Sequence, residues 1–400
     1  MGTSRLWLPL RSRDYRMLWL GQMVSVVGDK VNQIAMGILV YKATGSMLQM
    51  GIMLAISTLP AAIFGLPAGA FVDRWDRRKT MIAADLLRAL LVLAIPAIAT
   101  VGVPAVYAVA FLVSTISLFF EPAKLSMIPE LVAQEDLMAA NSLDNATMSV
   151  SELFGLAFAG TLVATLGYRV AFFLDAGTYL ISAVFIVLVS YRGAREPLRM
   201  AKVRLFDDVM RGVRHINDVP LLRDLMGVYT IAAMGVAASV TAVYLLALER
   251  FNAGAPGLAI LDAAITIGLL LGSFSVGRTV SEGSGRKFLL GLCAFGVLFI
   301  AVALAPSMLV AAPLLLAGGI ANMWFQVPLA TMIQQSARGE LRGRVFAAKA
   351  TLSRLFTVVG FVGAGVLAER IGLGATIVAI GGIVLLAGAV GFTRYSLRTA

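Results

Sequence analysis

Long apolar segments, separated by short polar or charged ones, run along almost the whole chain. This pattern predicts helices that cross a lipid bilayer, since about 20 apolar residues suffice for one crossing. The expected spans, numbered 1 to 12 in chain order, are 17–41, 50–72, 80–101, 105–120, 146–166, 169–189, 225–247, 257–276, 287–305, 308–327, 345–367 and 375–392. The sequence therefore predicts an all-α membrane protein with twelve transmembrane helices.

The composition supports a membrane protein and argues against an enzyme. Of the 400 residues, 59% are hydrophobic and 14% are charged, too few polar groups to cover a soluble protein of this length. A single cysteine, Cys293, and a single histidine, His215, argue against disulfides, Cys or His metal clusters and histidine relays. The sequence has no ATP-binding G-x-x-x-x-G-K-[ST] motif. We therefore expect no enzymatic activity, metal or cofactor, and the protonmotive force as the energy source.

The positive charges are distributed unevenly between the two sides of the expected membrane. The formal net charge is +11, and most of the 33 Lys and Arg residues lie in loops on one side. The opposite loops contain only Lys42, Arg169, Arg250 and Arg370. Positive loops stay in the cytoplasm, which predicts a multi-pass protein of the cell (inner) membrane with both termini cytoplasmic. We expect a monomer whose partners are the lipid bilayer, protons and a small-molecule substrate, and no nucleic acid.

The two halves of the chain are related by an internal repeat. A Met-Ile pair and three glycines recur at one constant offset. The related residues are Met127-Ile128 with Met332-Ile333, and Gly155, Gly160 and Gly167 with Gly360, Gly365 and Gly372. The repeat predicts two pseudo-symmetric six-helix bundles, 1–189 and 225–400, joined by a central cytoplasmic loop, 190–224.

The central loop contains a periodic apolar pattern among charged residues. Leu205, Val209, Val213 and Ile216 recur at helical spacing on one face. This pattern predicts an amphipathic helix that lies on the bilayer surface. We expect the helix to tether the two bundles; a regulatory role is the alternative.

A charged hairpin, Gly69 to Lys79 (GAFVDRWDRRK), connects spans 2 and 3. Each charge costs about 2.5–3.5 kcal/mol at the centre of a membrane helix, so these residues must lie in water. The stretch resembles the loop 2–3 signature of the major facilitator superfamily. The matching residues are Gly69, Asp73, Arg74 and Arg77, whereas Asp76 and Arg78 depart from the signature.

Further stretches resemble one branch of that superfamily, the macrolide-efflux and enterobactin-exporter-like transporters. They are the pair Gly28-Asp29, VYKATGS at 40–46, ADLLRA at 84–89, EPAKLSMIPELVAQEDLMAANSL at 121–143 and ELRGRVFA at 340–347. The resemblance implies the major facilitator fold and secondary transport by alternating access. We expect a proton-coupled exporter (antiporter) of an amphipathic drug-like molecule. Export of a siderophore or other endogenous metabolite is one alternative, and a lipid-handling protein or non-transporting receptor is another.

A polar stripe follows span 1. The side chains of Gln22, Ser25, Asp29, Asn32, Gln33 and Met36 lie within a narrow arc when residues are placed at 100° intervals around a helix. In the fold that the sequence resembles, spans 1, 4, 7 and 10 line a central cavity. We therefore predict that this stripe lines the substrate cavity together with Tyr229, Met234, Asn322 and Gln326 of spans 7 and 10.

Acidic residues inside spans are candidates for proton coupling, because a carboxyl group in a membrane is costly and usually functional. We predict this role for Asp29, Glu152 and Asp262. Asp29 is alternatively a structural acid paired with a Lys or Arg, or a partner for a cationic substrate. Asp262 is alternatively part of an external gate. Glu152 begins a partial match to the antiporter signature, SELFGLAFAG at 151–160.

Two further acids are expected to have structural roles. We interpret Asp175 as a polar group that helps helices pack, and Asp85 with Arg88 as a local ion pair beside the hairpin.

The hairpin is also predicted to act as a conformational latch. In the resembled fold, span 2 of one half lies against span 11 of the other. Asp73 would then meet the start of span 11 near Arg344, where the helix dipole attracts a carboxylate. Gly69, Arg74 and Arg77 would hold the loop in place, with Arg77 paired to an acid of its own half.

Overall fold

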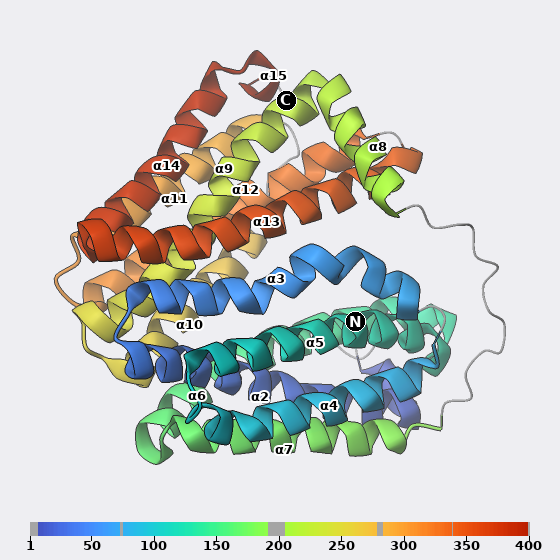
Figure 1. Cartoon of the computed structure of the whole chain (residues 1–400). Helices are drawn as coiled ribbons and strands as arrows, with labels where there is room; N and C mark the ends of the chain where they lie inside the picture. The colour runs from blue at the N-terminus through green and yellow to red at the C-terminus, as the bar shows by residue number, and fades with distance from the viewer. Residues whose placement is uncertain (1–6, 73–74, 191–204, 278–282, 338, 399–400) are drawn as a thin grey trace. The chain divides into compact units, whose positions relative to one another are not determined.

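The computed structural model describes residues 7–72, 75–190, 205–277, 283–337 and 339–398, and their regular structure is helical throughout. Among these residues, twelve helices are long and apolar enough to cross a membrane, which confirms the predicted number of spans. The first six are α2 (Arg13–Thr44), α3 (Met47–Val72), α4 (Arg77–Ile98), α5 (Val103–Leu131), α6 (Leu137–Leu166) and α7 (Tyr168–Val187) (Figure 1).

The second six are related to the first in length and order. They are α9 (Pro220–Leu245), α10 (Gly254–Gly277), α11 (Ser284–Ala303), α12 (Met308–Ser336), α13 (Gly339–Ile371) and α14 (Leu373–Thr393). Shorter elements are η1 (Leu8–Arg11), η2 (Gln134–Asp136), the π-helical η3 (Leu246–Arg250) that continues α9, and α15 (Tyr395–Arg398). The predicted amphipathic helix of the central loop is α8 (Leu205–Asp218).

The prediction for span 4 was too short. It ended the span at residue 120, but α5 continues to Leu131. Lys124, which the sequence pattern assigned to a loop, therefore lies inside a helix and is buried. The length of the apolar run did not predict this last part of α5, because it contains charged residues. These residues have partners within the protein.

Particular residues define where helices begin. Asp76, which departs from the hairpin signature, caps α4: its carboxylate accepts a hydrogen bond from the backbone N–H of Lys79 at 2.9 Å. Gly167 and Gly372 precede α7 and α14 with φ of 82° and 81°, a conformation that glycine adopts without steric cost. These two glycines are partners in the repeat read from the sequence, so the repeat extends to backbone geometry.

Contacts divide the chain into two compact units. Unit 1 comprises Met1–Ala43 and Ile63–Val203, and unit 2 comprises Thr44–Ala62 and Arg204–Ala400. This division departs from the predicted one in the first part of α3, which belongs with unit 2.

The segment Thr44–Ala62 has specific contacts within unit 2. A small core joins Leu54 and Ala55 to Phe361 of α13 and to α9. The carboxylate of Glu369 accepts a hydrogen bond from the backbone N–H of Leu48 at 3.1 Å, at the first turn of α3.

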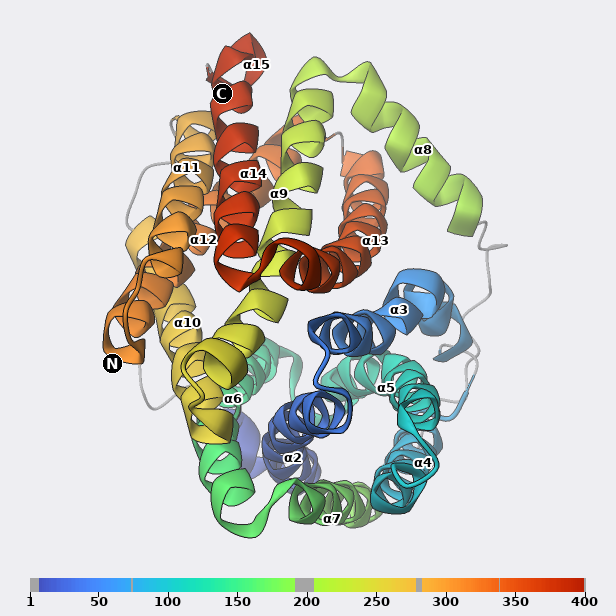
Figure 2. The same ribbon diagram turned by 60° about the vertical axis from the view of Figure 1, so that its left-hand side comes forward.

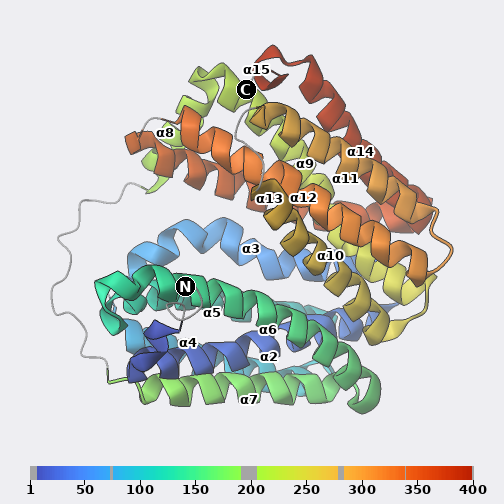
Figure 3. The same ribbon diagram turned by 180° about the vertical axis from the view of Figure 1, so that it is seen from behind.

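Within unit 1, α4 lies between α5 and α7 (Figure 2). Within unit 2, α12 packs against both α10 and α11, and α11 packs against α14 (Figure 3). α8 packs on α13, where a Cβ at Gly212 would collide with the carbonyl group of Arg344. The predicted helix is therefore confirmed, and its close partner is α13.

Candidate functional site

A buried charged cluster occupies the interior of unit 1. It consists of Asp29 on α2, Asp85 and Arg88 on α4, and Asp175 and Tyr179 on α7, and we call it the charged cluster. Arg88 forms an ion pair with Asp85, and their side chains are 6% and 0% exposed. The Tyr179 hydroxyl donates a hydrogen bond to the Asp29 carboxylate. Three helices thus bring together residues that are far apart in the sequence.

Arg88 is held by aromatic rings as well as by a carboxylate. Its guanidinium carbon lies 4.7 Å from the ring centre of Phe120 and 4.3 Å from that of Tyr179. Both distances are within the range of attractive cation–π contacts. Tyr179 therefore connects the guanidinium to Asp29, since its ring faces one and its hydroxyl binds the other.

The charges of the cluster do not balance. Among the described residues, three carboxyl groups and one guanidinium meet there, with Asp175 fully buried. Asp175 Oδ2 and Arg88 Nε are buried without a hydrogen-bond partner in the part of the chain that the structure describes. An uncompensated carboxylate at such a site is costly, whereas a protonated carboxyl group is neutral. The arrangement can therefore hold a proton.

Glycine on α2 allows α7 to approach. A Cβ at Gly28 would collide with the side chains of Thr178 and Asp175. A turn and a half earlier, the amide of Gln22 donates a hydrogen bond to Ser182 Oγ at 3.2 Å. Gly28 thus allows α7 to approach α2, and Asp29 forms a hydrogen bond to that helix.

The polar stripe predicted along α2 does not form one surface. Gln22, Ser25 and Met36 are buried, whereas Gln33 is exposed. The Oδ1 atom of Asn32 is buried and has no hydrogen-bond partner among the described residues. Gln22 and Asp29 bind α7 of their own unit. The prediction placed these two side chains toward a cavity, but they contact the interior of unit 1.

Glu152 has a different environment from Asp29. Its carboxylate lies 3.1 Å from Lys30 Nζ, with side chains 39% and 23% exposed. Gly155, one turn later on α6, allows α2 to approach, since a Cβ there would lie 2.9 Å from Lys30 Cβ. Glu152 is therefore a paired and partly exposed acid, whereas Asp29 belongs to a buried group.

The sequence did not predict that four residues of the charged cluster meet inside unit 1. Asp85 and Arg88 were predicted to pair, and they do, but inside the bundle rather than beside the hairpin. Asp175 was predicted as a packing group, and Tyr179 was not singled out. The available signal was that Arg88 and three acids all lie within predicted spans.

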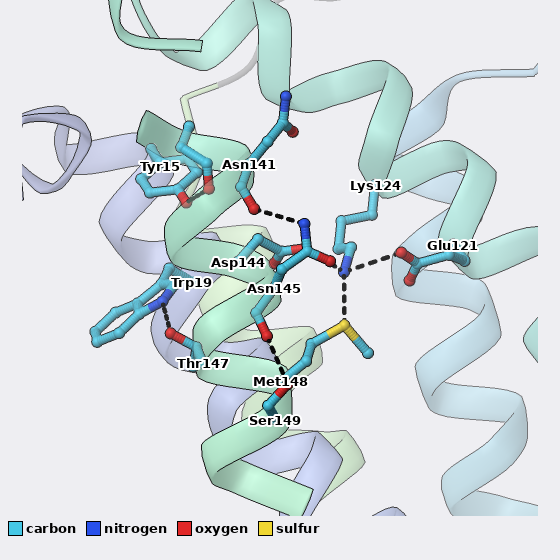
Figure 4. Close-up of polar contacts among 11 residues, drawn as sticks. Tyr15, Trp19, Glu121, Lys124, Asn141, Asp144, Asn145, Thr147, Met148 and Ser149 are labelled. Atoms are coloured by element: carbon cyan, nitrogen blue, oxygen red, sulfur yellow. Dashed lines mark hydrogen bonds and ion pairs between the residues drawn. The ribbon is translucent and has the colours of Figure 1, made fainter. Parts of the chain in front are cut away.

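A second ion cluster of unit 1 surrounds Lys124 (Figure 4). The side chain is 1% exposed, and its Nζ lies 3.1 Å from Glu121 and 3.0 Å from Asp144 of α6. The sulfur of Met148 is also near, at 3.9 Å. Two carboxylates thus compensate one buried ammonium group, and the pair with Asp144 joins α5 to α6.

The same part of α6 is also bound to α2. The Tyr15 hydroxyl donates a hydrogen bond to the carbonyl oxygen of Ala140 at 2.8 Å, and Trp19 Nε1 donates one to Thr147 Oγ1 at 2.8 Å (Figure 4). These bonds fix the helix that carries Asp144.

A cavity of about 240 Å³ lies within unit 2, among α9, α10, α11 and α12. Its wall is mainly apolar and includes the rings of Tyr244, Phe295 and Phe299. Its polar members include Asp262 and Asn322. Asp262 was predicted for proton coupling or an external gate, and Asn322 for substrate binding. Both therefore line the same cavity.

Close helix packing shapes this cavity. A Cβ at Gly268 of α10 would collide with the carbonyl group of Leu316, and a Cβ at Gly272 would lie 2.8 Å from Met323 Cβ. α10 and α12 can pack so closely only because these positions lack side chains.

Three other predicted cavity residues do not line this space. Tyr229 is buried between α9 and α13, where its hydroxyl lies 3.2 Å from Ser353 Oγ and its ring 4.9 Å from Lys349 Nζ. Met234 and Gln326 are half-buried and lie outside the wall of the cavity.

The structure describes only part of the predicted latch. Asp73 and Arg74 lie outside the described residues, and Gly69 lies within α3. Arg77 forms an ion pair with Glu130 of α5, and it donates a hydrogen bond to the carbonyl oxygen of Ser126 at 3.1 Å. The latch itself stays a prediction.

Arg344 lies near the beginning of α13, beneath α8. The structure therefore shows that Arg344 lies close to α8, within unit 2.

Comparison with known proteins identifies the family. The model of the Major Facilitator Superfamily matches residues 18–360. The chain belongs to this superfamily. It is a multi-pass membrane transporter of small-molecule substrates and not an enzyme, as the sequence predicted.

Curated relatives include efflux proteins that match over most of both chains. The multidrug efflux pump Tap of Mycolicibacterium fortuitum is 28% identical over 396 residues, 96% of this chain and 96% of its own. Macrolide efflux protein A of Streptococcus pyogenes is 23% identical over 370 residues, 89% of each chain. The predicted resemblance to macrolide-efflux transporters is confirmed.

Solved structures support the fold. A bacterial homolog of the human lysosomal transporter Spinster, in an inward-facing conformation, has a TM-score of 0.72 at 16% identity and covers 98% of both chains. The nucleoside transporter NupG has a TM-score of 0.78 at 10% identity, covering 95% of this chain and 98% of its own. At these identities the likeness concerns the fold alone.

Proposed function

We propose that the protein is a proton-coupled exporter of amphipathic cations that works by alternating access. The observation that carries this proposal is the charged cluster, in which three carboxyl groups share one guanidinium inside unit 1. Relatives that are named as efflux proteins support the direction of transport.

Asp29 is the residue that we assign to proton exchange. Arg88 is already paired with Asp85, so this ion pair is neutral, and we assign a permanent proton to the fully buried Asp175. An ionised Asp29 then makes the cluster negative. A proton on Asp29 removes that charge, and loss of the proton restores it beside Tyr179 and Arg88. Such a change in buried charge alters the relative stability of two conformations, as proton coupling requires.

The substrate class follows from the cavity of unit 2. Aromatic rings attract cations and stack on flat molecules, and the carboxyl group of Asp262 supplies a negative charge. A cavity of about 240 Å³ is larger than the 150 Å³ that accommodates benzene in an engineered protein. One aromatic ring system with an amine fits this space, and the rest of a larger substrate extends beyond it.

The proposal includes the orientation in the membrane. The basic loops and both termini lie in the cytoplasm of a cell whose inner membrane contains the protein, and the working unit is a monomer. No cofactor takes part, and the protonmotive force supplies about 2.3 kcal/mol per charge for each 100 mV.

Proteoliposomes with an imposed pH gradient test the coupling. The D29N variant should lose uphill transport of a fluorescent aromatic cation, yet keep downhill exchange and binding. D218N is the matched control, because Asp218 is exposed at the end of α8. Uphill transport by D29N at the wild-type rate would overturn the assignment.

The same liposomes test the substrate class. The D262N variant should bind the aromatic cation more weakly and leave a neutral analogue of similar shape unaffected. An anionic siderophore is the alternative substrate, and its uptake would not decrease in this variant. Equal loss for all three compounds would point to damage of the fold instead.

A further inference from the structure

A groove on unit 2 lies between α9 and α14, which pack side by side (Figure 2). Its volume is about 660 Å³, within the range of roughly 300–1,000 Å³ that is usual for ligand sites. It lies where α9 begins and α14 ends. The groove is separate from the cavity that contains Asp262 and shares no lining residue with it.

The lining of the groove changes from charged to apolar along both helices. On α9, Arg223, Gly227 and Ile231 follow one another at intervals of four residues and line the same side. After the end of α14, Arg394 lies at the mouth, followed inward by Val390 and Leu386 on that helix at the same interval. Both helices thus present an arginine at one end and about 12 Å of apolar surface beyond it.

The two arginines at the mouth are available to an anion. Arg223 and Arg394 are both exposed, and neither guanidinium has a carboxylate partner among the described residues. The carboxylate of Asp224, also at the mouth, accepts a hydrogen bond from Ser396 Oγ at 2.6 Å. Two guanidinium groups that line one groove supply the positive charge and the N–H donors that a phosphate group binds.

The apolar part of the groove is open. Ile231, Leu386 and Val390 are 47%, 64% and 50% exposed, more than is usual for side chains packed inside a bundle. A Cβ at Gly227 would meet no atom within 4 Å, so the absence of a side chain there leaves space rather than admitting a neighbouring helix. This space suits a flexible hydrocarbon chain.

We propose that this groove binds one anionic phospholipid, with its phosphate group between Arg223 and Arg394 and an acyl chain along Gly227 and Ile231. The mouth lies on the side that the basic loops assign to the cytoplasm, where anionic headgroups attract arginines at helix ends. A free phosphate ion would contact the arginines but not the apolar groove, so the apolar lining favours a lipid as the ligand. The inference goes beyond the proposed function and does not depend on proton coupling or on the transported substrate.

Lipid titration of the purified full-length protein in detergent tests the proposal. The probes are dioleoyl phosphatidylglycerol, dioleoyl phosphatidylcholine and inorganic phosphate, and native mass spectrometry counts the bound lipids. The wild-type protein should retain one phosphatidylglycerol in preference to phosphatidylcholine. Inorganic phosphate at the same concentration should neither bind in its place nor displace it.

Two kinds of variant separate the charged and apolar parts of the site. R223Q/R394Q should weaken phosphatidylglycerol binding by about tenfold or more, because each arginine contributes to attraction of the headgroup. R214Q, at an exposed position of α8 outside the groove, should stay within about twofold of the wild type.

G227L should also lose the lipid, because its side chain fills the acyl part while both arginines remain. G374L is its matched control, since Gly374 lies at the other end of α14 and has equally open surroundings. Thermal unfolding without added lipid shows whether each variant is folded.

Three results would overturn the proposal. One is equal retention of the two lipids by the wild type, and another is unchanged lipid binding by folded R223Q/R394Q or folded G227L. Displacement of the lipid by inorganic phosphate alone would show that the arginines form an anion site without a role for the groove.

Discussion

The corresponding helix contacts of the two units have the same backbone arrangement and different chemistry. In unit 1, Gly28 of α2 packs against Asp175 and Thr178 of α7. In unit 2, Gly235 of α9 packs against Val384 and the backbone of Ile380 on α14. At the offset that relates Gly167 to Gly372, Asp175 corresponds to Ile380 and Tyr179 to Val384. One repeat therefore has an interior of charged and hydroxyl groups, and the other has an aliphatic interior.

The chemistry also differs between the contact of α6 with α2 in unit 1 and the corresponding contact of α13 with α9 in unit 2. Gly155 packs against α2 beside Lys30, whose ammonium group pairs with Glu152. Gly360 packs against Met234 and Ala237 of α9, a contact without charged groups. The small residues that set helix separation are thus shared, and the charged ones are not. Close packing and ion pairing are therefore independent properties of this repeat, and of the two contacts compared, the one in unit 1 combines them.

The largest expected effect is that of removing the guanidinium from the charged cluster. R88L should destabilise the protein by about 3–5 kcal/mol, because it leaves buried carboxylates without their cation. C293A, at the corresponding position of α11, should cost only about 1 kcal/mol, since it removes a single half-buried sulfur atom. Thermal unfolding in detergent measures both.

The double variant D85L/R88L tests the same comparison from the other direction. It makes this part of unit 1 resemble the apolar interior of unit 2, and it should recover much of the stability lost in R88L. If R88L unfolds no earlier than C293A, the ion pair does not stabilise unit 1.

Lys124 gives the next largest effect. At the same repeat offset, Lys124 and Asp144 correspond to Leu329 and Lys349, so the ion pair has no counterpart in unit 2. K124L should cost about 1–3 kcal/mol, because Asp144 is left largely buried without its partner. K124L/D144L should be more stable than K124L alone. Chemical unfolding monitored by tryptophan fluorescence checks the order, and equal stability of the two variants would contradict it.

The paired glycines distinguish structure from coupling. G28A and G235A both add a methyl group to a tight helix contact, and each should cost about 1–3 kcal/mol. Only G28A displaces a member of the charged cluster, so only G28A should change the number of protons exchanged per substrate. Reversal-potential measurements in proteoliposomes give that ratio. The same change in both variants would mean that the charged cluster has no special role.

The smallest effect on stability is expected for Glu152. E152Q removes a partly exposed ion pair and should cost at most about 1 kcal/mol. Uphill transport should remain, because the proposal assigns proton exchange to Asp29. Loss of uphill transport in a stable E152Q protein would transfer the coupling role to α6.

The sequence alone determined the number of spans, the amphipathic helix α8, the repeat and the family. These features depend on the length of apolar runs, on helical periodicity and on short signatures. All three are properties of the local sequence and do not depend on tertiary contacts. The positive φ of Gly167 and Gly372 confirms the repeat at single residues. Candidate acids could also be named, since an ionisable residue within a span is visible in the sequence.

Tertiary structure decided which of those acids act together. Periodicity placed Asp29 on a polar face of α2, but only the packing of α4 and α7 brought Arg88 and Tyr179 to it. Likewise, Lys124 was assigned to a loop because it follows the end of the predicted span 4, and only its partners on α5 and α6 make its burial possible. The energy of a buried charge depends on partners that are distant in sequence, and so its role is settled by the fold.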